Sequence, residues 1–381
     1  MSSDSIGLYV HVPFCATLCG YCDFYSEVPG QGAFGPLVDA LLIELEQAVE
    51  GIRVETIFVG GGTPSLLPPG ELGRLFERLG AVAGRDGAVE FTVEANPASL
   101  TDAKAAILRD AGVNRVSMGA QSFFPHELRV LDRIHSPADI PRSAEIIHRT
   151  GFAHFNLDLI FGVPGQTDAT WAESIRRAIG LGPDHLACYG LTYEEGTPLT
   201  ERLERGLIVP AEEEDEASQY EQTIAALAGA GFEHYEISNF AKPGARSRHN
   251  LRYWLNLPGR GIGPSAASYI GGRRWRNVPD TKRYAECLGN GTSPRIDEEE
   301  LPPAARAGET AMLGLRLVEG VDLARFGDAT GFDFMKLYGA LIEELTAGGL
   351  LRVSPTHVAL TRRGLLLADA VIAEFLQPEG A

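Results

Sequence analysis

The sequence lacks the features of several protein classes. It has no apolar run near the ~20 residues that a membrane-spanning helix needs; its most apolar stretch, 364–376, contains two acidic residues. Its first seven residues have neither the basic nor the apolar region of a secretory signal. Positive charge is also in deficit, since 33 Lys and Arg face 51 Asp and Glu. The net charge of −18 argues against nucleic acid as a partner. Together these absences predict a cytoplasmic protein.

Cysteine is scarce as well, with five residues in a chain of 381. Three lie within eight residues, at Cys15, Cys19 and Cys22, while Cys188 and Cys287 are isolated. In a cytoplasmic protein this spacing indicates metal or redox chemistry rather than a disulfide framework, although disulfides stay open as an alternative. The apolar share of 44% and the charged share of 22% exclude global disorder and allow a core of normal size.

Short apolar segments alternate with longer amphipathic ones. The expected strands are 7–12, 55–59, 90–94, 115–119, 156–161 and 185–191, with an edge strand at 234–237. The expected helices are 36–49, 69–79, 102–111, 138–150, 168–181 and 212–230. Strand followed by helix, repeated six times, predicts a parallel sheet with helical crossovers. Each expected strand ends in, holds or runs into a polar or glycine position, or is followed by the cysteine loop, and in a barrel these positions would share the rim where active sites form.

The character of the sequence changes near Glu233. From 240 to 276 the chain is rich in Gly, Arg and aromatic residues without a clear period, so we expect an irregular segment over 236–300. Beyond it, helical stripes and a hairpin at 350–360 predict a small winged-helix-like module over 301–381 that ends in one helix, 362–375. Residues 1–235 would form the barrel.

The clustered cysteines suit an iron–sulfur site. Thiolates three and four residues apart can wrap a four-iron cluster, which normally takes four Cys ligands. Only three are local here, so one iron would be left open, as a catalytic zinc keeps an open position. Zinc is the competing metal; His11 is near enough to be its fourth ligand, but the strand alternation turns it away.

As a set, the motifs resemble a known superfamily. Cys15-x-x-x-Cys19-x-x-Cys22, with Tyr9 ahead and Gly60-Gly-Gly-Thr-Pro64 behind, resembles the radical S-adenosylmethionine (SAM) superfamily. Within it, essentially the whole chain is similar to the branch of oxygen-independent coproporphyrinogen III oxidases and HemW-type heme chaperones. The resemblance implies an α/β fold: a partial (β/α)6 barrel with a small C-terminal helical, winged-helix-like module.

The resemblance also implies a role for each matching residue. Cys15, Cys19 and Cys22 would ligate a [4Fe-4S] cluster, and SAM would chelate its open iron. The residues implied around SAM, or around a second SAM, are Tyr9, Tyr21, Gly61, Gly62, Thr63, Glu94, Gln121, Arg133, Asp158 and Thr192. The chemistry is compatible, because glycine lets backbone donors approach closely and a guanidinium suits a carboxylate. For Arg133, a surface helix charge stays open.

Two features separate the branches. The oxidase resemblance would place another Cys two residues after the third, where this sequence has Phe24. The chaperone pattern His-Asn-x-x-Tyr-Trp is intact; its residues are His249, Asn250, Tyr253 and Trp254. His and Tyr are known axial ligands of heme iron, and Trp can stack on a macrocycle. For His249, a purely structural role in the loop stays open.

The surroundings of this pattern add to the expectation. Arg246, Arg248 and Arg252 could pair with heme propionates, and an exposed loop would suit the release of cargo. Because the cysteines lie far away in the order of motifs, Cys15→Ser is expected to leave heme binding intact. Cys188 is expected in the core, and Cys287 has no evident role.

The sequence therefore predicts a heme chaperone that carries a [4Fe-4S] cluster and SAM. Heme and heme-requiring respiratory proteins would be its partners, with membrane-bound acceptors left open. The alternative is an oxygen-independent coproporphyrinogen III oxidase, which converts coproporphyrinogen III to protoporphyrinogen IX by oxidative decarboxylation. Phe24 favours the chaperone, while the complete set of SAM residues keeps the enzyme open. A cluster protein with neither activity is the third hypothesis.

Overall fold

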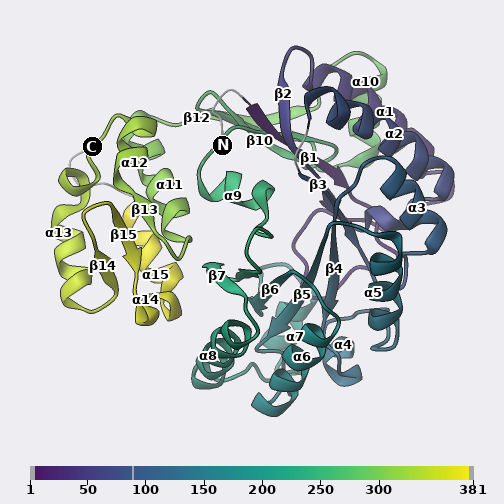
Figure 1. The fold of residues 1–381 in the computed structure, drawn as a ribbon. Helices are drawn as coiled ribbons and strands as arrows, with labels where there is room; N and C mark the ends of the chain where they lie inside the picture. The colour runs from purple at the N-terminus through teal and green to yellow at the C-terminus, as the bar shows by residue number, and fades with distance from the viewer. Residues whose placement is uncertain (1–4, 88–89, 377–381) are drawn as a thin grey trace.

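The computed structural model describes residues 5–87 and 90–376; residues 1–4, part of the start that lacks signal features, lie outside the described residues. In the described chain, twelve strands form one sheet in the order β12-β11-β10-β9-β1-β2-β3-β4-β5-β6-β8-β7 (Figure 1). The first six are β1 (Ser5–Val12), β2 (Arg53–Gly61), β3 (Glu90–Ala95), β4 (Arg115–Gln121), β5 (His154–Phe161) and β6 (His185–Gly190). They are parallel neighbours in chain order, which confirms the predicted partial barrel.

Helices cover the outer face of this curved sheet (Figure 1). They are α1 (Phe34–Ala48), α2 (Pro69–Asp86), α3 (Asp102–Asp110), α4 (Pro125–Val130), α5 (Asp139–Thr150), α6 (Asp168–Gly180), α7 (Pro198–Glu204) and α8 (Glu213–Gly229), with a 3-10 turn η1 (Pro64–Leu66) before α2. The apolar stripe of α1 shows why they form: Leu37, Leu41 and Leu45 recur four residues apart and are buried in the core shared with the strands.

The inner face of the sheet is polar. Every second residue of a strand points to the same face, and the register places such residues side by side. One row along this face contains Glu94, Ser117 and Asn156. The residues between them face the helices and are apolar, as in the row Val59, Val93, Val116 and Phe155. Parallel strands buried on both faces are usually apolar throughout, so this alternation indicates an inner face kept for polar contacts.

Residues 236–300 are mostly regular, so the expectation of an irregular segment was wrong. This part of the chain contains β7 (Glu233–Glu236), β8 (Asn239–Ala241), α9 (Arg248–Trp254), β9 (Gly259–Ile262), β10 (Ala267–Ile270), β11 (Arg273–Asn277), α10 (Thr281–Gly289) and β12 (Arg295–Glu300). Strand β9 pairs in parallel with β1. Its glycines hide it in the sequence, because a Cβ on Gly261 would lie 2.3 Å from the carbonyl oxygen of Ala267. Because this close pairing requires glycine, the sequence lacks the alternation of apolar and polar side chains by which a strand is normally recognised.

The C-terminal module has its own antiparallel sheet, in the order β13-β15-β14. Its elements are α11 (Pro303–Leu315), β13 (Val321–Asp322), α12 (Leu323–Thr330), α13 (Phe334–Ala347), β14 (Leu351–Val353), β15 (His357–Leu360), α14 (Arg362–Leu366), α15 (Ala368–Ala373) and the 3-10 turn η2 (Glu374–Leu376). The predicted hairpin is confirmed as β14–β15. The single closing helix was wrong, since it breaks at Leu367, whose φ of −117° and ψ of 26° are not helical. No described helix is both long and apolar enough to cross a membrane.

Candidate functional site

The cysteine loop, defined as residues 13–28, follows β1 and is folded back on itself. The Cys15 amide donates to the Glu27 carbonyl at 3.0 Å, and the Glu27 amide donates to the Pro13 carbonyl at 2.9 Å. Cys15, Cys19 and Cys22 are each half-buried, and all five cysteines are free thiols. Because none forms a disulfide, all three loop thiols keep their lone pairs for a ligand.

The three thiols lie within electrostatic reach of one another. Burial, with smaller contributions from the neighbouring Cys19 and Cys15, raises the pKa of Cys22 to about 11. Burial also raises the pKa of Cys15, and Cys19 adds to this effect. Thiolates gathered in this way repel each other unless a cation holds them, and they are the donors that iron–sulfur clusters take. The donor set therefore fits such a cluster.

His11 does not supply the fourth ligand that a zinc ion would need. Its Nδ1 lies 3.0 Å from the Tyr9 hydroxyl, and its Nε2 lies 2.8 Å from the Tyr25 carbonyl oxygen, so both ring nitrogens are engaged. Across residues 5–87 and 90–376, no three His, Cys, Asp or Glu side chains are gathered around a point that suits a single metal ion. A four-iron cluster differs chemically, since each cysteine binds its own iron.

The glycines that end β2 pack directly against the cysteine loop. A Cβ on Gly61, where φ is +104°, would lie 2.5 Å from the His11 ring, and one on Gly62 would lie 2.7 Å from the loop backbone. Glycine is needed here because no side chain fits between the strand and the loop. The next residue, Thr63, points its hydroxyl at the sulfur of Cys15 at 3.8 Å.

Arg133 lies half-buried behind the cysteine loop, so it is not a surface helix charge. Its Nη1 donates to the sulfur of Cys19 at 3.4 Å, and its Nη2 donates to the Gly119 carbonyl at 2.7 Å. Its Nε is buried and has no hydrogen-bond partner among the described residues. A guanidinium with a spare donor at this edge of the sheet suits a carboxylate ligand.

Two carboxyl groups lie near each other on the inner face. Burial, together with the nearby Asp158, raises the pKa of Glu94 to about 8, while burial raises that of Asp158 to about 6. Glu94 also accepts a hydrogen bond from the Gly61 amide at 3.2 Å. Burial, followed by the charge of Glu94, raises the pKa of Tyr9. Raised pKa values at a shared polar surface are typical of ligand-binding sites.

The other predicted SAM residues lie around the same edge of the sheet. Gln121 ends β4 in the left-handed region, at φ +61°, and its amide lies beside Gly119. Such strained backbone is held where surrounding structure fixes it, often at functional sites. Tyr21, in the cysteine loop, packs against the apolar cluster of Leu131 and Leu199. Thr192 follows β6 and is exposed.

The His-Asn-x-x-Tyr-Trp segment forms helix α9 on the inner face, so the expectation of an exposed loop was wrong. His249 is only 2% exposed. Its Nδ1 lies 2.8 Å from the Thr56 hydroxyl and its Nε2 lies 2.9 Å from the Tyr253 hydroxyl. Burial, with a smaller contribution from Arg252, lowers the pKa of His249 to about 3. The Glu90 carboxylate accepts from the His249 amide at 2.8 Å and so holds the first turn of the helix.

The three arginines expected to face propionates are paired within the protein. Arg252 is buried and donates to Glu55 at 2.6 Å. Arg248 donates to the other oxygen of the same carboxylate, also at 2.6 Å. Arg246 donates to Glu319 at 2.5 Å. These contacts fix α9 to β2 and the residues just before α9 to the C-terminal module, which is a structural use of the charges.

The last residues of α9 have different surroundings. Trp254 packs its ring under the Arg316 guanidinium, 4.6 Å from the ring centre. Tyr253 is 42% exposed, and it lies close enough to Tyr9 and Glu94 to influence their electrostatics. Asn250 is half-buried. The predicted heme residues and SAM residues therefore share one face, although their motifs are far apart in the order of the sequence.

Three inner-face residues were missed at the level of sequence. Asn156 donates through Nδ2 to Asp158 at 2.7 Å and to Ser117 at 2.7 Å. Tyr189 is 41% exposed, and Asp158 contributes to the raised pKa of its phenol. A signal for Ser117 and Asn156 was present, because they stand two residues before Gly119 and Asp158 on their strands. Counting back in steps of two from these singled-out positions would have found them.

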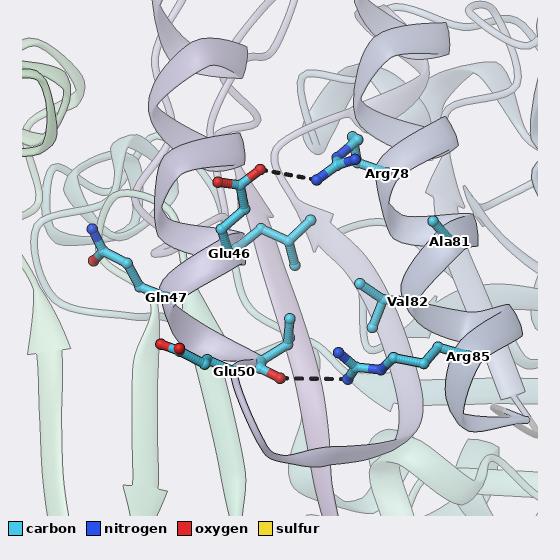
Figure 2. Close-up of a pocket in the computed structure, with 9 residues that line it drawn as sticks. Glu46, Gln47, Glu50, Arg78, Ala81, Val82 and Arg85 are labelled. Atoms are coloured by element: carbon cyan, nitrogen blue, oxygen red, sulfur yellow. Dashed lines mark hydrogen bonds and ion pairs between the residues drawn. The ribbon is translucent and has the colours of Figure 1, made fainter.

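A surface groove of about 550 Å³ lies between α1 and α2, on the helical side of the molecule (Figure 2). Arg78 pairs with Glu46 across it at 2.9 Å, and Arg85 donates to the Val49 carbonyl at 3.4 Å. None of the residues that the sequence analysis singled out lines this groove. The inner face of the sheet is therefore the better candidate site.

Comparisons with known proteins show what the chain is similar to. The Radical SAM superfamily matches residues 9–178, and the HemN C-terminal domain matches residues 301–367. Among solved structures, coproporphyrinogen III oxidase (HemN) from Escherichia coli superposes with a TM-score of 0.83 at 23% identity, covering 98% of this chain and 90% of that one. At this identity the likeness establishes the fold.

Curated relatives match at higher identity. The heme chaperone HemW of Mycobacterium tuberculosis (strain H37Rv) is 41% identical, with 99% of this chain and 96% of that protein covered. The heme chaperone HemW of Bacillus subtilis is 36% identical over 97% and 98% of the two chains. The mitochondrial radical S-adenosyl methionine domain-containing protein 1 of Bos taurus is 32% identical over 98% and 88%. The chain belongs to the HemW family within the radical SAM superfamily.

Proposed function

We propose that Cys15, Cys19 and Cys22 ligate a [4Fe-4S] cluster at the end of β1. When bound, such a cluster supplies an open iron for the amino and carboxylate groups of SAM and an electron for its reduction. The mutual proximity of the three free thiols supports the cluster. The unpartnered Nε of Arg133 supports a carboxylate ligand beside it.

The proposed SAM site covers the inner face of the sheet at the strand ends next to the cysteine loop. Its residues, with a second SAM as an open extension, are Tyr9, Tyr21, Gly61, Gly62, Thr63, Glu94, Gln121, Arg133, Asp158 and Thr192. In this proposal Glu94 and Asp158 accept hydrogen bonds from hydroxyl or ammonium groups of SAM, and the glycines expose backbone donors.

We propose further that the protein is a heme chaperone, delivering heme to heme-requiring respiratory proteins, membrane-bound ones included. The observation that carries this proposal is the 41% identity to a heme chaperone HemW over nearly the whole length of both chains. The heme site is assigned to α9, with the residues His249, Asn250, Tyr253 and Trp254. Tyr253 is its exposed contact, and His249 orients the Tyr253 phenol through their hydrogen bond. A cytoplasmic location belongs to the same proposal, since free cluster thiols need a reducing compartment.

The oxidase is the second candidate, because the inner face carries the full set of proposed SAM residues beside the cysteine loop. Phe24 argues against the oxidase. It is 64% exposed, and it stands where the resemblance to the oxidase branch would place a fourth local cysteine. In the chaperone proposal SAM serves the cycle of heme binding and transfer, and the porphyrin precursor is no substrate.

One experiment separates the two candidates. Anaerobically reconstituted protein is incubated with SAM, reductant and coproporphyrinogen III, and in parallel is titrated with heme. We expect no protoporphyrinogen and one heme bound per chain. Catalytic formation of protoporphyrinogen would replace the chaperone by the oxidase, and absence of heme binding would leave only a cluster protein with neither activity.

A further inference from the structure

A chain of buried hydrogen bonds begins at Asp158 on the inner face. Asn156, two residues earlier on β5, donates to one carboxylate oxygen of Asp158 at 2.7 Å. Ser117 on β4 points its hydroxyl at the other oxygen at 3.3 Å. The side-chain oxygen of Asn156 lies 2.6 Å from Nδ1 of His185 on β6. Three neighbouring strands thus contribute to one network around Asp158.

The chain continues from His185 to the start of α9. The Nε2 of His185 lies 2.7 Å from the hydroxyl of Tyr235 on β7. The same hydroxyl oxygen accepts from the backbone amide of Ser247 at 3.3 Å. Ser247 is the N-cap of α9, and its own hydroxyl accepts from the Asn250 amide. The network therefore joins the carboxylate of Asp158 to the first residues of the helix.

Chemistry fixes the direction of every bond in this chain. The Asp158 carboxylate only accepts, so the amide nitrogen of Asn156 faces it, and the Asn156 oxygen accepts from Nδ1 of His185. Burial, with a smaller contribution from Arg115, lowers the pKa of His185 well below its ordinary value, so the ring is neutral and its Nε2 accepts from the Tyr235 hydroxyl. The Tyr235 oxygen in turn accepts from the Ser247 amide. All the donors point toward Asp158.

The members of the chain have no other evident use. Asn156, His185 and Tyr235 are 5%, 2% and 1% exposed. None of them is among the residues proposed to contact the cluster, SAM or heme. A buried polar network is costly unless each member is satisfied, and a satisfied one fixes a single geometry. With aligned donors, a change at one end alters the strength of the bonds along the whole chain.

We propose that Asn156, His185 and Tyr235 are positioning residues that hold the Asp158 carboxylate and couple its occupancy to the start of α9. This rests on the proposed function, in which Asp158 contacts SAM and α9 carries the heme residues. When SAM donates hydrogen bonds to Asp158, the strength of the hydrogen bond from Asn156 to this carboxylate changes. The change reaches the Ser247 amide through His185 and Tyr235, so SAM alters how firmly the first turn of α9 is held.

Amide hydrogen exchange of residues 247–250 tests the coupling in the full, anaerobically reconstituted chain, with and without SAM. In the unmodified protein SAM is expected to change the exchange rate at these amides by at least about fivefold, the lower end of ordinary couplings between sites. Tyr235→Phe keeps the ring but removes the hydroxyl, so the response should vanish. Tyr220→Phe is the matched control, because Tyr220 is also buried and its hydroxyl donates to the Ile237 carbonyl at 2.8 Å, outside the chain.

A SAM titration of the same samples separates the outcomes. An unchanged response in Tyr235→Phe overturns the coupling, and so does a bound SAM that leaves these amides unaffected in the unmodified protein; the proposed function survives both results. No SAM binding in the unmodified protein overturns the SAM site as well. If Tyr235→Phe does not fold, the responses of His185→Gln and His185→Leu to SAM test the coupling instead. Glutamine keeps a donor and an acceptor, so it should keep part of the response, whereas leucine keeps neither and should lose it. Equal responses in these two variants would also overturn the coupling.

Discussion

The cysteine loop and helix α9 lie on the same inner face but differ in how their reactive side chains are satisfied. The three thiols of the loop are half-buried and free. In α9, both ring nitrogens of His249 are engaged, and Arg252 is paired with Glu55 in the core. Half-buried thiols that form no disulfide are available to a cofactor, whereas fully satisfied buried groups mainly hold the fold. The two motifs look alike in sequence as dense clusters of ligand-type residues, and only the structure separates their uses.

The largest expected effect concerns the loop. Cys15→Ser, Cys19→Ser and Cys22→Ser should each abolish the absorption near ~400 nm of a reconstituted thiolate-ligated cluster, because each thiolate holds one iron. Cys188→Ser is the control, since Cys188 is 1% exposed in the core and lies outside the cysteine loop in the sequence. Loss of the band in Cys188→Ser with a normally folded protein would contradict the three-ligand assignment.

The next effect concerns the structural side of the comparison. Arg252→Ala should lower the free energy of unfolding by about 3–5 kcal/mol, because it removes the buried guanidinium that donates to Glu55 and to the Ser5 and Pro258 carbonyls. Arg78→Ala removes an ion pair whose side chains are 54% and 66% exposed, and it should leave the denaturation midpoint nearly unchanged. Chemical denaturation of both variants measures the difference. Equal midpoints would show that α9 is not held by this pair.

The buried carboxyl groups of the inner face should lower the free energy of unfolding when they are ionised. The pKa of Glu94 is raised from 4.5 to about 8, so between these values the unfolded chain releases a proton that the folded chain keeps. The free energy of unfolding then falls as pH rises. Glu94→Gln removes this fall and should be more stable than the unmodified protein at pH 8 by about 1–3 kcal/mol, since water screens part of the penalty.

Denaturation of the SAM-free protein at pH 5 and pH 8 measures this difference. The advantage of Glu94→Gln should shrink toward pH 5, where the Glu94 carboxyl is protonated in the fold. Glu50→Gln, at an exposed surface position, serves as the control. Stability curves of Glu94→Gln and the unmodified protein that run parallel between the two pH values would contradict the assigned environment.

The smallest expected effect tells which residue of α9 contacts heme, Tyr253 or Trp254. Tyr253→Phe removes the hydroxyl of a half-exposed tyrosine on the inner face of the sheet. It should weaken heme binding about tenfold, or about 1.4 kcal/mol. Trp254→Phe should change the affinity less, because the Trp254 ring is already stacked with Arg316. Spectral titration with heme measures both variants. A larger loss in Trp254→Phe would move the heme contact to the other end of the helix.

Local pattern in the sequence was sufficient for much of the fold. The six parallel strands, their crossover helices and the C-terminal hairpin follow from apolar periodicity, because each element must bury one side of itself. The cysteine loop and the glycines after β2 were placed at one edge by the parallel topology alone. Cys188, expected in the core, is 1% exposed.

The tertiary structure decided where α9 lies and how its residues are used. The Thr56–His249 contact joins positions 193 residues apart, and Glu90 reaches the same helix from 159 residues away. Strand β9 finds β1 through glycines that carry no period. A pattern along the chain reports which side of an element is buried, but hydrogen bonds and charges are satisfied by whatever the fold brings near, and those partners are set by packing across the whole molecule.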